Sequence, residues 1–189
     1  MAVCILLFLA ACGGAPKGAQ AQDNAQDAAV NETDAYGYTV GSYEDIMRTA
    51  FFDFTVNDAW LSEAYEDYVS EEGRILLAVD ITVHNYTDIP VIMYDLDFRA
   101  QWVVEPVEDY ALPMTTAQDG FSATAVAPVG DMLPSEYEVA AGESVRGVLL
   151  FSVPLGQTQF SLAYEETFSD GTTGDPFTVY FAPDERIAL

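Results

Sequence analysis

The chain has 189 residues, with 31 acidic side chains against 6 basic ones, so its formal net charge at pH 7 is −25. A surface of this charge repels the phosphates of nucleic acids and of anionic lipids, which excludes nucleic-acid binding and electrostatic attachment to a membrane. With a single histidine, a catalytic triad or a zinc site would depend on one residue, His84.

An apolar run of about ten residues opens the chain and is too short to span a membrane, for which a helix needs about twenty residues. Its length and the small residues at its end predict a secretory signal over residues 1–11. The sequence Leu9-Ala10-Ala11-Cys12 resembles the bacterial lipobox, in which the cysteine is lipidated and becomes the new N-terminus. The alternative is an ordinary signal peptide with an incidental Cys12.

Lipidation of Cys12 would make the membrane a partner of the mature protein. Two acyl chains give stable attachment, whereas one chain binds only reversibly. Cys4 would be removed with the signal and Cys12 would be alkylated, so no disulfide is expected. We therefore expect a lipid-anchored protein on the extracytoplasmic face of the cell membrane.

Residues 12–48 are predicted to form the lipidated end and a flexible linker. Before Tyr36 the segment is rich in Ala, Gln, Gly, Asp and Asn and has almost no large apolar side chains, so it cannot build a core. As a coil of about 36 residues it would span roughly 30 to 36 Å. One short turn of helix is expected near Tyr43 to Arg48.

From residue 49 onward, apolar and polar residues alternate with a period of two, which is typical of half-buried strands. The expected strands cover Phe52–Val56, Ile75–Val83, Leu96–Trp102, Val145–Val153, Phe160–Tyr164 and Phe177–Phe181. Four prolines divide the less regular stretch between residues 105 and 144 into loops and short edge pieces. We predict an all-β, immunoglobulin-like antiparallel sandwich over residues 49–189.

Three stretches of this region also resemble a known family. They are "LLAVDITVHNYTDIPV", "AAGESVRGVLLFSVP" and "FSLAYEE". They are similar to the bacterial lipoprotein domain of unknown function DUF4352, which has a telokin-like, immunoglobulin-like sandwich. The matching motifs are turns and strands rather than catalytic groups. The resemblance therefore implies a fold and a location, and no activity.

The sequence offers no catalytic residues that we would assign. Gly142-Glu143-Ser144-Val145-Arg146-Gly147 approaches the nucleophile elbow of hydrolases, but its final glycine is one position late. His84 is expected to be a polar residue at the end of a strand. We predict that the protein is not an enzyme and that it uses no cofactor.

Carboxylates are the one reactive group in excess. Asp95 and Asp97 are expected on one face of a strand, where a glycan hydrolase could use paired acids. Asp170 and Asp175 lie in the glycine-containing loop "FSDGTTGDPF", which could supply oxygen ligands to calcium. The same residues are typical of an ordinary hairpin turn.

Together these features predict a lipid-anchored, extracytoplasmic binding or accessory domain without catalysis, whose partner is a cell-envelope protein or a glycan. Two alternatives remain, a glycan-directed hydrolase with paired carboxylates and a calcium-dependent adhesion module. Loop tyrosines could form a contact surface. They are Tyr65, Tyr68, Tyr86, Tyr94, Tyr110 and Tyr137.

Overall fold

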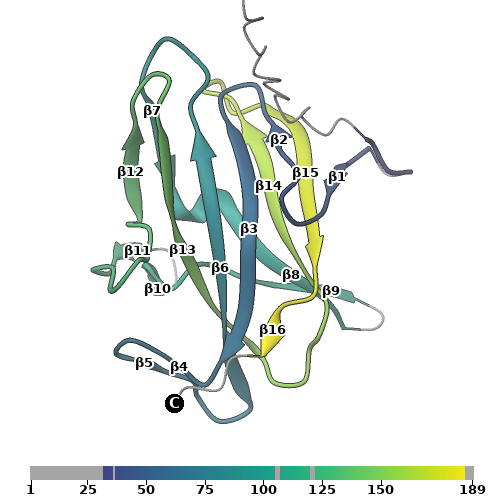
Figure 1. Ribbon diagram of the computed structural model, residues 1–189, viewed down its shortest axis with the longest axis vertical. Coiled ribbons are helices and arrows are strands. Elements are labelled where there is room, and N and C mark those ends of the chain that lie inside the picture. The colour runs from purple at the N-terminus through teal and green to yellow at the C-terminus, as the bar shows by residue number, and fades with distance from the viewer. Residues whose placement is uncertain (1–31, 36, 105–106, 120–121, 186–189) are drawn as a thin grey trace, which may run out of the picture.

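The computed structural model describes residues 32–35, 37–104, 107–119 and 122–185 (Figure 1). The signal segment, Cys12 and most of the linker lie outside the described residues, so the expectations about them stay predictions. Both cysteines precede residue 32, and the described part therefore contains no disulfide, as expected. Among the described residues, no helix is long and apolar enough to cross a membrane.

The regular secondary structure of the described chain consists of strands and one turn of 3-10 helix. The strands are β1 (Thr39–Gly41), β2 (Met47–Arg48), β3 (Asp53–Ser62), β4 (Ala64–Tyr65), β5 (Tyr68–Val69), β6 (Arg74–His84), β7 (Val91–Tyr94), β8 (Phe98–Val104), β9 (Val107–Ala111), β10 (Thr116–Asp119), β11 (Ser122–Ala125), β12 (Glu136–Val139), β13 (Ser144–Pro154), β14 (Phe160–Thr167), β15 (Thr173–Phe181) and β16 (Asp184–Glu185). A single turn of 3-10 helix, η1 (Asp95–Asp97), separates β7 from β8.

Two sheets pack face to face and confirm the predicted β-sandwich (Figure 1). The first sheet has the order β1-β15-β14-β8-β9, and the second has the order β13-β6-β3-β16, with β2 also paired to β3. The β7–β12, β10–β11 and β4–β5 pairs form separate two-stranded sheets. The short strands β1 and β16 pair in parallel with β15 and β3, whereas the other strand pairs are antiparallel.

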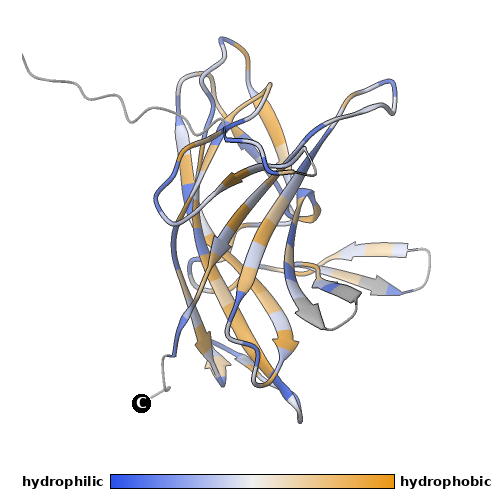
Figure 2. Ribbon diagram, turned by 90° about the vertical axis from the view of Figure 1, so that its right-hand side faces the viewer, coloured by the Kyte–Doolittle hydropathy of each residue, from blue (hydrophilic) through white to orange (hydrophobic). Residues whose placement is uncertain are grey.

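The core lies between the two sheets, because alternate residues of the long strands point inward. Figure 2 shows that hydrophobic residues are concentrated in these strands. Aromatic rings from both sheets meet at Phe54, whose ring centroid lies 5.4 Å from that of Phe98 and 6.4 Å from that of Phe177. Both contacts are edge-on, the geometry that aromatic rings favour. Full burial of one such side chain stabilises the fold by about 1.5 to 3 kcal/mol.

The outward face of β6 differs from the half-exposed face that the alternation predicts. Leu76 and Ala78 are buried there in a second cluster with Met132, Val148 and Leu150. The segment before β12 crosses this face, because the Leu133 amide donates to the Val148 carbonyl and the Val148 amide donates to the Asp131 carbonyl. One half of the strand is therefore apolar on both faces.

The sandwich also begins earlier than residue 49. β1 pairs with β15 at Thr39↔Phe177, and Met47 in β2 is completely buried. The helical turn expected between Tyr43 and Arg48 is wrong, because Tyr43 and Glu44 form a turn and the chain then enters β2. Two or three residues of strand are too short to give a readable alternation, so this part of the predicted linker belongs to the fold.

Candidate functional site

A groove lies on the outer face of the first sheet, the face turned away from the core. In β14, Phe160, Leu162 and Tyr164 point into the core, so Ser161 between them points outward. Ser161 is paired with Gln101 of β8 on one side and with Tyr180 of β15 on the other. The registers of three strands thus place these side chains in one row across the sheet.

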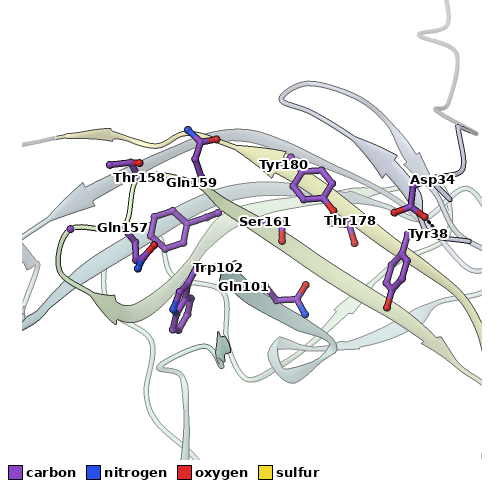
Figure 3. Close-up of a pocket in the computed structure, with 12 residues that line it drawn as sticks. Asp34, Tyr38, Gln101, Trp102, Gln157, Thr158, Gln159, Ser161, Thr178 and Tyr180 are labelled. Atoms are coloured by element: carbon purple, nitrogen blue, oxygen red, sulfur yellow. Dashed lines mark hydrogen bonds between the residues drawn. The ribbon is translucent and has the colours of Figure 1, made fainter. Parts of the chain in front are cut away.

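The groove exists because its floor is made of small side chains, Ser161 in this row and Thr178, which lies two residues before Tyr180 in β15. Ser161 and Thr178 are 6% and 4% exposed, while Tyr180 and Tyr38 are 56% and 42% exposed. Figure 3 shows the two small residues between Tyr180 and Gln101, with Tyr38 at one end. The hollow has a volume of about 790 Å³, and the loop 156–159 closes its other end.

The lining of this outer groove is polar and almost uncharged. Among the described residues that line it, Asp34 is the one acid, and no lysine or arginine is present. The Asp34 carboxylate accepts a hydrogen bond of 2.9 Å from the Tyr38 amide, so part of its charge is used within the chain. Within the described part of the chain, the side chains of Gln101, Ser161 and Thr178 have no hydrogen-bond partner.

A buried tryptophan lies against the groove. Trp102 is 4% exposed and also lines the hollow. Its indole Nε1–H has no acceptor among the described residues. A buried donor without an acceptor is rare in native structures, because it loses its bond to water without replacement. Among the described residues, the groove therefore combines exposed rings with hydroxyl and amide groups that have no partner, and a core tryptophan borders it.

A second, smaller hollow of about 330 Å³ lies on the same outer face and contains ionisable groups. Its lining includes Asp97, Glu165, Arg99 and Tyr110, and Tyr110 is the register partner of Gln101 in the groove row. The Arg99 guanidinium lies 3.6 Å from the Glu165 carboxylate. Burial raises the pKa of the Asp97 carboxyl, and repulsion from Asp95 raises it further.

The placement expected for Asp95 and Asp97 on one strand face is wrong, because both belong to the 3-10 turn η1 and β8 begins only at Phe98. The Asp95 side chain is buried and accepts hydrogen bonds from the hydroxyls of Thr115 at 2.6 Å and Thr116 at 2.9 Å. Desolvation nevertheless raises the pKa of Asp95. Asp97 lines the smaller hollow.

The calcium candidates are used in a hairpin. Asp170 accepts hydrogen bonds from the Thr172 amide and hydroxyl, and these bonds lower the pKa of its carboxyl. Asp175 lies within β15, and its amide donates to the buried Glu166 carboxylate. No group of three or more acidic, histidine or cysteine side chains in the described ranges could hold a metal ion. Calcium binding at Asp170 and Asp175 stays a prediction.

The structure brings together two residues that the sequence argument set aside. Ser144 and His84 are register partners, and the Ser144 hydroxyl lies 3.1 Å from the His84 Nδ1 atom. Asp53 is next in the row, but both of its carboxylate oxygens accept hydrogen bonds from Arg48. His84 thus shares a bond with serine, while the adjacent acid is engaged by arginine rather than by histidine.

Sequence reasoning missed the outer groove. Its residues were visible only as the outward half of predicted strands, and nothing in the alternation shows that β8, β14 and β15 are neighbours. The loop tyrosines proposed as a contact surface are dispersed in the fold. Tyr110 borders the smaller hollow, whereas Tyr137 is largely buried, and burial raises its pKa.

Comparison with known proteins gives a family match and four structural neighbours, of which three are described here. A family model described as a domain of unknown function (DUF4352) matches residues 42–173. The first neighbour, a candidate lipoprotein (ycdA) from Bacillus subtilis subsp. subtilis str. 168, has 16% sequence identity and a TM-score of 0.50. The match covers 72% of this chain and 38% of that one, so this chain corresponds to well under half of the neighbour's length.

The other two neighbours match over nearly their whole length. The yjhA protein from Bacillus subtilis has 15% identity and a TM-score of 0.47, with 76% of this chain and 99% of that chain covered. An uncharacterized β-sandwich protein from Clostridium difficile 630 has 11% identity and a TM-score of 0.44, with 80% and 97% covered. The comparison with curated proteins gave no match.

Proposed function

The chain belongs to the DUF4352 family, and from this premise we propose that it is a lipid-anchored, extracytoplasmic binding domain without a catalytic role. The observation that carries the proposal is the outer groove, a hollow of about 790 Å³ on the open face of a sheet. Pockets of this size, with a few converging polar groups among aromatic rings, are typical of ligand sites.

The anchor is the second part of the proposal and rests on the lipobox-like sequence at Cys12. The first structural neighbour is itself described as a candidate lipoprotein, which supports the same location. An acyl anchor would also explain how a chain with a net charge of −25 stays beside anionic lipids that repel it.

The anchor is tested by comparing Cys12→Ala with Cys4→Ala in the full chain. We expect Cys12→Ala to lose both sedimentation with membranes and incorporation of labelled palmitate, because it removes the thiol that carries the acyl chains. The matched control Cys4→Ala should keep both properties. If Cys12→Ala still sediments with membranes and carries the label, the anchor is elsewhere.

The binding role is tested with isolated bacterial cell envelopes and the full chain carrying Cys12→Ala. Co-sedimentation should fall when Tyr180→Ala removes an exposed ring of the groove. Tyr94→Ala removes a ring of similar exposure from β7, outside the groove, and should leave co-sedimentation unchanged. Equal loss in both variants, or no loss in either, would contradict a binding role for the groove.

A second candidate function has one observation in its favour. Asp97, whose pKa is raised, lines the same hollow as Glu165, and a glycan hydrolase needs such an acid beside a second carboxylate. In that case the wild-type chain should release nitrophenol from a p-nitrophenyl glycoside. Asp97→Asn should reduce the rate by roughly 100-fold or more. Equal rates in the wild type and in an Asp97→Asn, Glu165→Gln variant would exclude it.

A further inference from the structure

We propose that the outer groove binds a short neutral oligosaccharide built of pyranose rings with equatorial hydroxyls. This inference rests on the binding role proposed above and adds the chemical class of the ligand. It follows from five properties of the described residues: the groove's charge, its rings, its polar groups, the length of the face and its position on the sheet.

The charge of the groove argues against ionic ligands. A ligand with several negative charges would find no lysine or arginine among the described lining residues, and the chain's net charge of −25 would repel it. The overall charge attracts a strongly cationic ligand to the protein, but among the described lining residues such a ligand would meet one acid, Asp34, whose carboxylate already accepts a bond from the Tyr38 amide. A neutral ligand suits this lining better, because it needs no charged partner and loses no ionic hydration on entering the groove.

The exposed rings suit the faces of sugars. Tyr180 and Tyr38 stand above the low floor formed by Ser161 and Thr178. A pyranose ring with equatorial hydroxyls presents C–H groups on both faces, and these pack against an aromatic ring without losing the hydroxyls' bonds to water. Tyrosine supplies this contact area at low entropic cost, since its side chain has few rotatable bonds.

The polar groups suit the edges of sugars. Gln101 and the loop residues Gln157 and Gln159 each offer an amide that can donate and accept at once, which matches a hydroxyl group or an acetamido group. The hydroxyls of Ser161 and Thr178 can also do both.

The length of the face suits a chain of rings rather than one ring. The row Tyr180–Ser161–Gln101–Tyr110 crosses four neighbouring strands. Its two tyrosines are 56% and 55% exposed. Three strand spacings separate them, which corresponds to about 14 Å.

An extended peptide fits this position less well. Peptides that bind by adding a strand need an open sheet edge with free backbone groups. The groove lies on the face of the sheet, and β1 occupies the edge of β15 beside it. We therefore assign the groove to a sugar chain and treat a peptide ligand as the outcome that would contradict the assignment.

Tryptophan fluorescence provides the test, because the chain has two tryptophans and only Trp102 borders the groove. The full chain carrying Cys12→Ala and Trp60→Phe is titrated with cellotetraose and with chitotetraose. Tetragalacturonate, with four rings that carry carboxylates, is the charged comparison. We expect a saturable change in Trp102 emission with at least one neutral sugar and none with tetragalacturonate.

Variants locate the binding. Tyr38→Ala and Tyr180→Ala should each weaken binding roughly tenfold, as loss of one aromatic contact does. Tyr94→Ala should leave the affinity unchanged. Calorimetric titration of the chain that keeps Trp60 measures the same affinity without relying on the Trp60→Phe substitution, should that variant fold poorly.

Three results would overturn the inference: no saturable binding of either neutral sugar at millimolar concentration, equal binding of tetragalacturonate, or unchanged affinity in both tyrosine variants.

Failure of the sugar assignment is distinguishable from failure of the proposed binding role. If neutral sugars do not bind but co-sedimentation with envelopes still depends on Tyr180, the binding role stands and the ligand is of another class, such as a peptide.

Discussion

At the scale of single residues, the raised pKa of Asp97 makes a testable prediction about how stability depends on pH. Burial and the nearby charge of Asp95 raise its pKa, although the Tyr94 amide donates to it at 2.9 Å. Between the ordinary aspartate pKa and the raised value, the folded state binds more protons than the unfolded state. The free energy of unfolding therefore falls as the pH rises through this window.

Replacing Asp97 with asparagine should remove this pH-dependent loss. We expect Asp97→Asn to be more stable than the wild type at pH 7, where the carboxylate is charged. The advantage should shrink near pH 3.9, the ordinary aspartate pKa, where the wild-type side chain is also neutral. Urea unfolding at the two pH values measures the difference.

Removing any acidic side chain from a protein with a net charge of −25 also weakens the repulsion among its carboxylates and so raises stability. A control variant must account for this general gain. Asp88 is exposed and lies in the turn after β6. Asp88→Asn removes the same charge from an exposed position, where burial does not destabilise the carboxylate. The stability gain from Asp97→Asn should therefore exceed that from Asp88→Asn at pH 7. Equal gains in the two variants would mean that the environment of Asp97 has no special effect.

At the scale of elements, the long strands could be predicted from the sequence because their core faces alternate cleanly. The stretches Ile75–Val83 and Val145–Val153 lie within β6 and β13, which pair over eleven positions from Ser144↔His84 to Pro154↔Arg74. The alternation in β3 fails after Val56, because the register with β6 shifts between Val56 and Asp58. An irregularity of this kind reverses which residues face inward, and no sequence period announces it.

The turn after β6 shows a different kind of predictable feature. Its asparagine, Asn85, is completely buried and donates to the carbonyls of Ile89 and Val139. The Asn85 side-chain oxygen accepts from the amide and hydroxyl of Thr87. This turn lies in a stretch that resembles the family, whose matching motifs are turns and strands, but the link of Asn85 to the end of β12 depends on tertiary structure.

Gly147 in β13 allows the close crossing of the segment before β12. A Cβ atom at this position would lie 2.8 Å from the Asp131 carbonyl oxygen and 2.7 Å from Leu133 Cδ2. We expect Gly147→Ala to reduce the free energy of unfolding by about 1 to 3 kcal/mol, because the backbone of the crossing segment must move.

Thermal or urea unfolding measures this loss. Ser144→Ala, at the exposed start of the same strand, is the matched control and should have a small effect. A loss that is no larger for Gly147→Ala than for Ser144→Ala would show that the crossing segment moves aside without cost.

At the scale of the whole molecule, a net charge of −25 should make stability depend on salt. Screening lengths fall from about 30 Å at 0.01 M salt to about 10 Å at 0.1 M, so repulsion between distant carboxylates weakens over this range. We expect the melting temperature to rise between these two concentrations.

Sodium chloride and choline chloride should raise the melting temperature equally if screening is the cause. No rise with either salt would contradict self-repulsion as a destabilising force. A further rise with millimolar calcium chloride, abolished by Asp170→Asn, would instead support the calcium prediction.

The candidate site was the least predictable feature, and the reason is geometric. Its residues come from the segment before β1, from β8, β14 and β15 and from the loop 156–159, and they meet only because these strands are neighbours in one sheet. Polar outward residues look alike on every strand, whether they face open solvent or border a hollow. The sequence therefore predicts that Ser161 and Thr178 point outward, and not that taller side chains surround them.

One consequence follows from the position of β1. It is the first strand of the fold, it pairs with β15 at only three positions, and Tyr38 immediately before it is a wall of the groove. If the protein is tethered through its N-terminal side, any tension between the membrane and a captured ligand reaches β1 before the other strands. A pulling force would then detach β1 and Tyr38 from the sheet while the rest of the sandwich stays folded. The ligand would therefore be released before the domain unfolds.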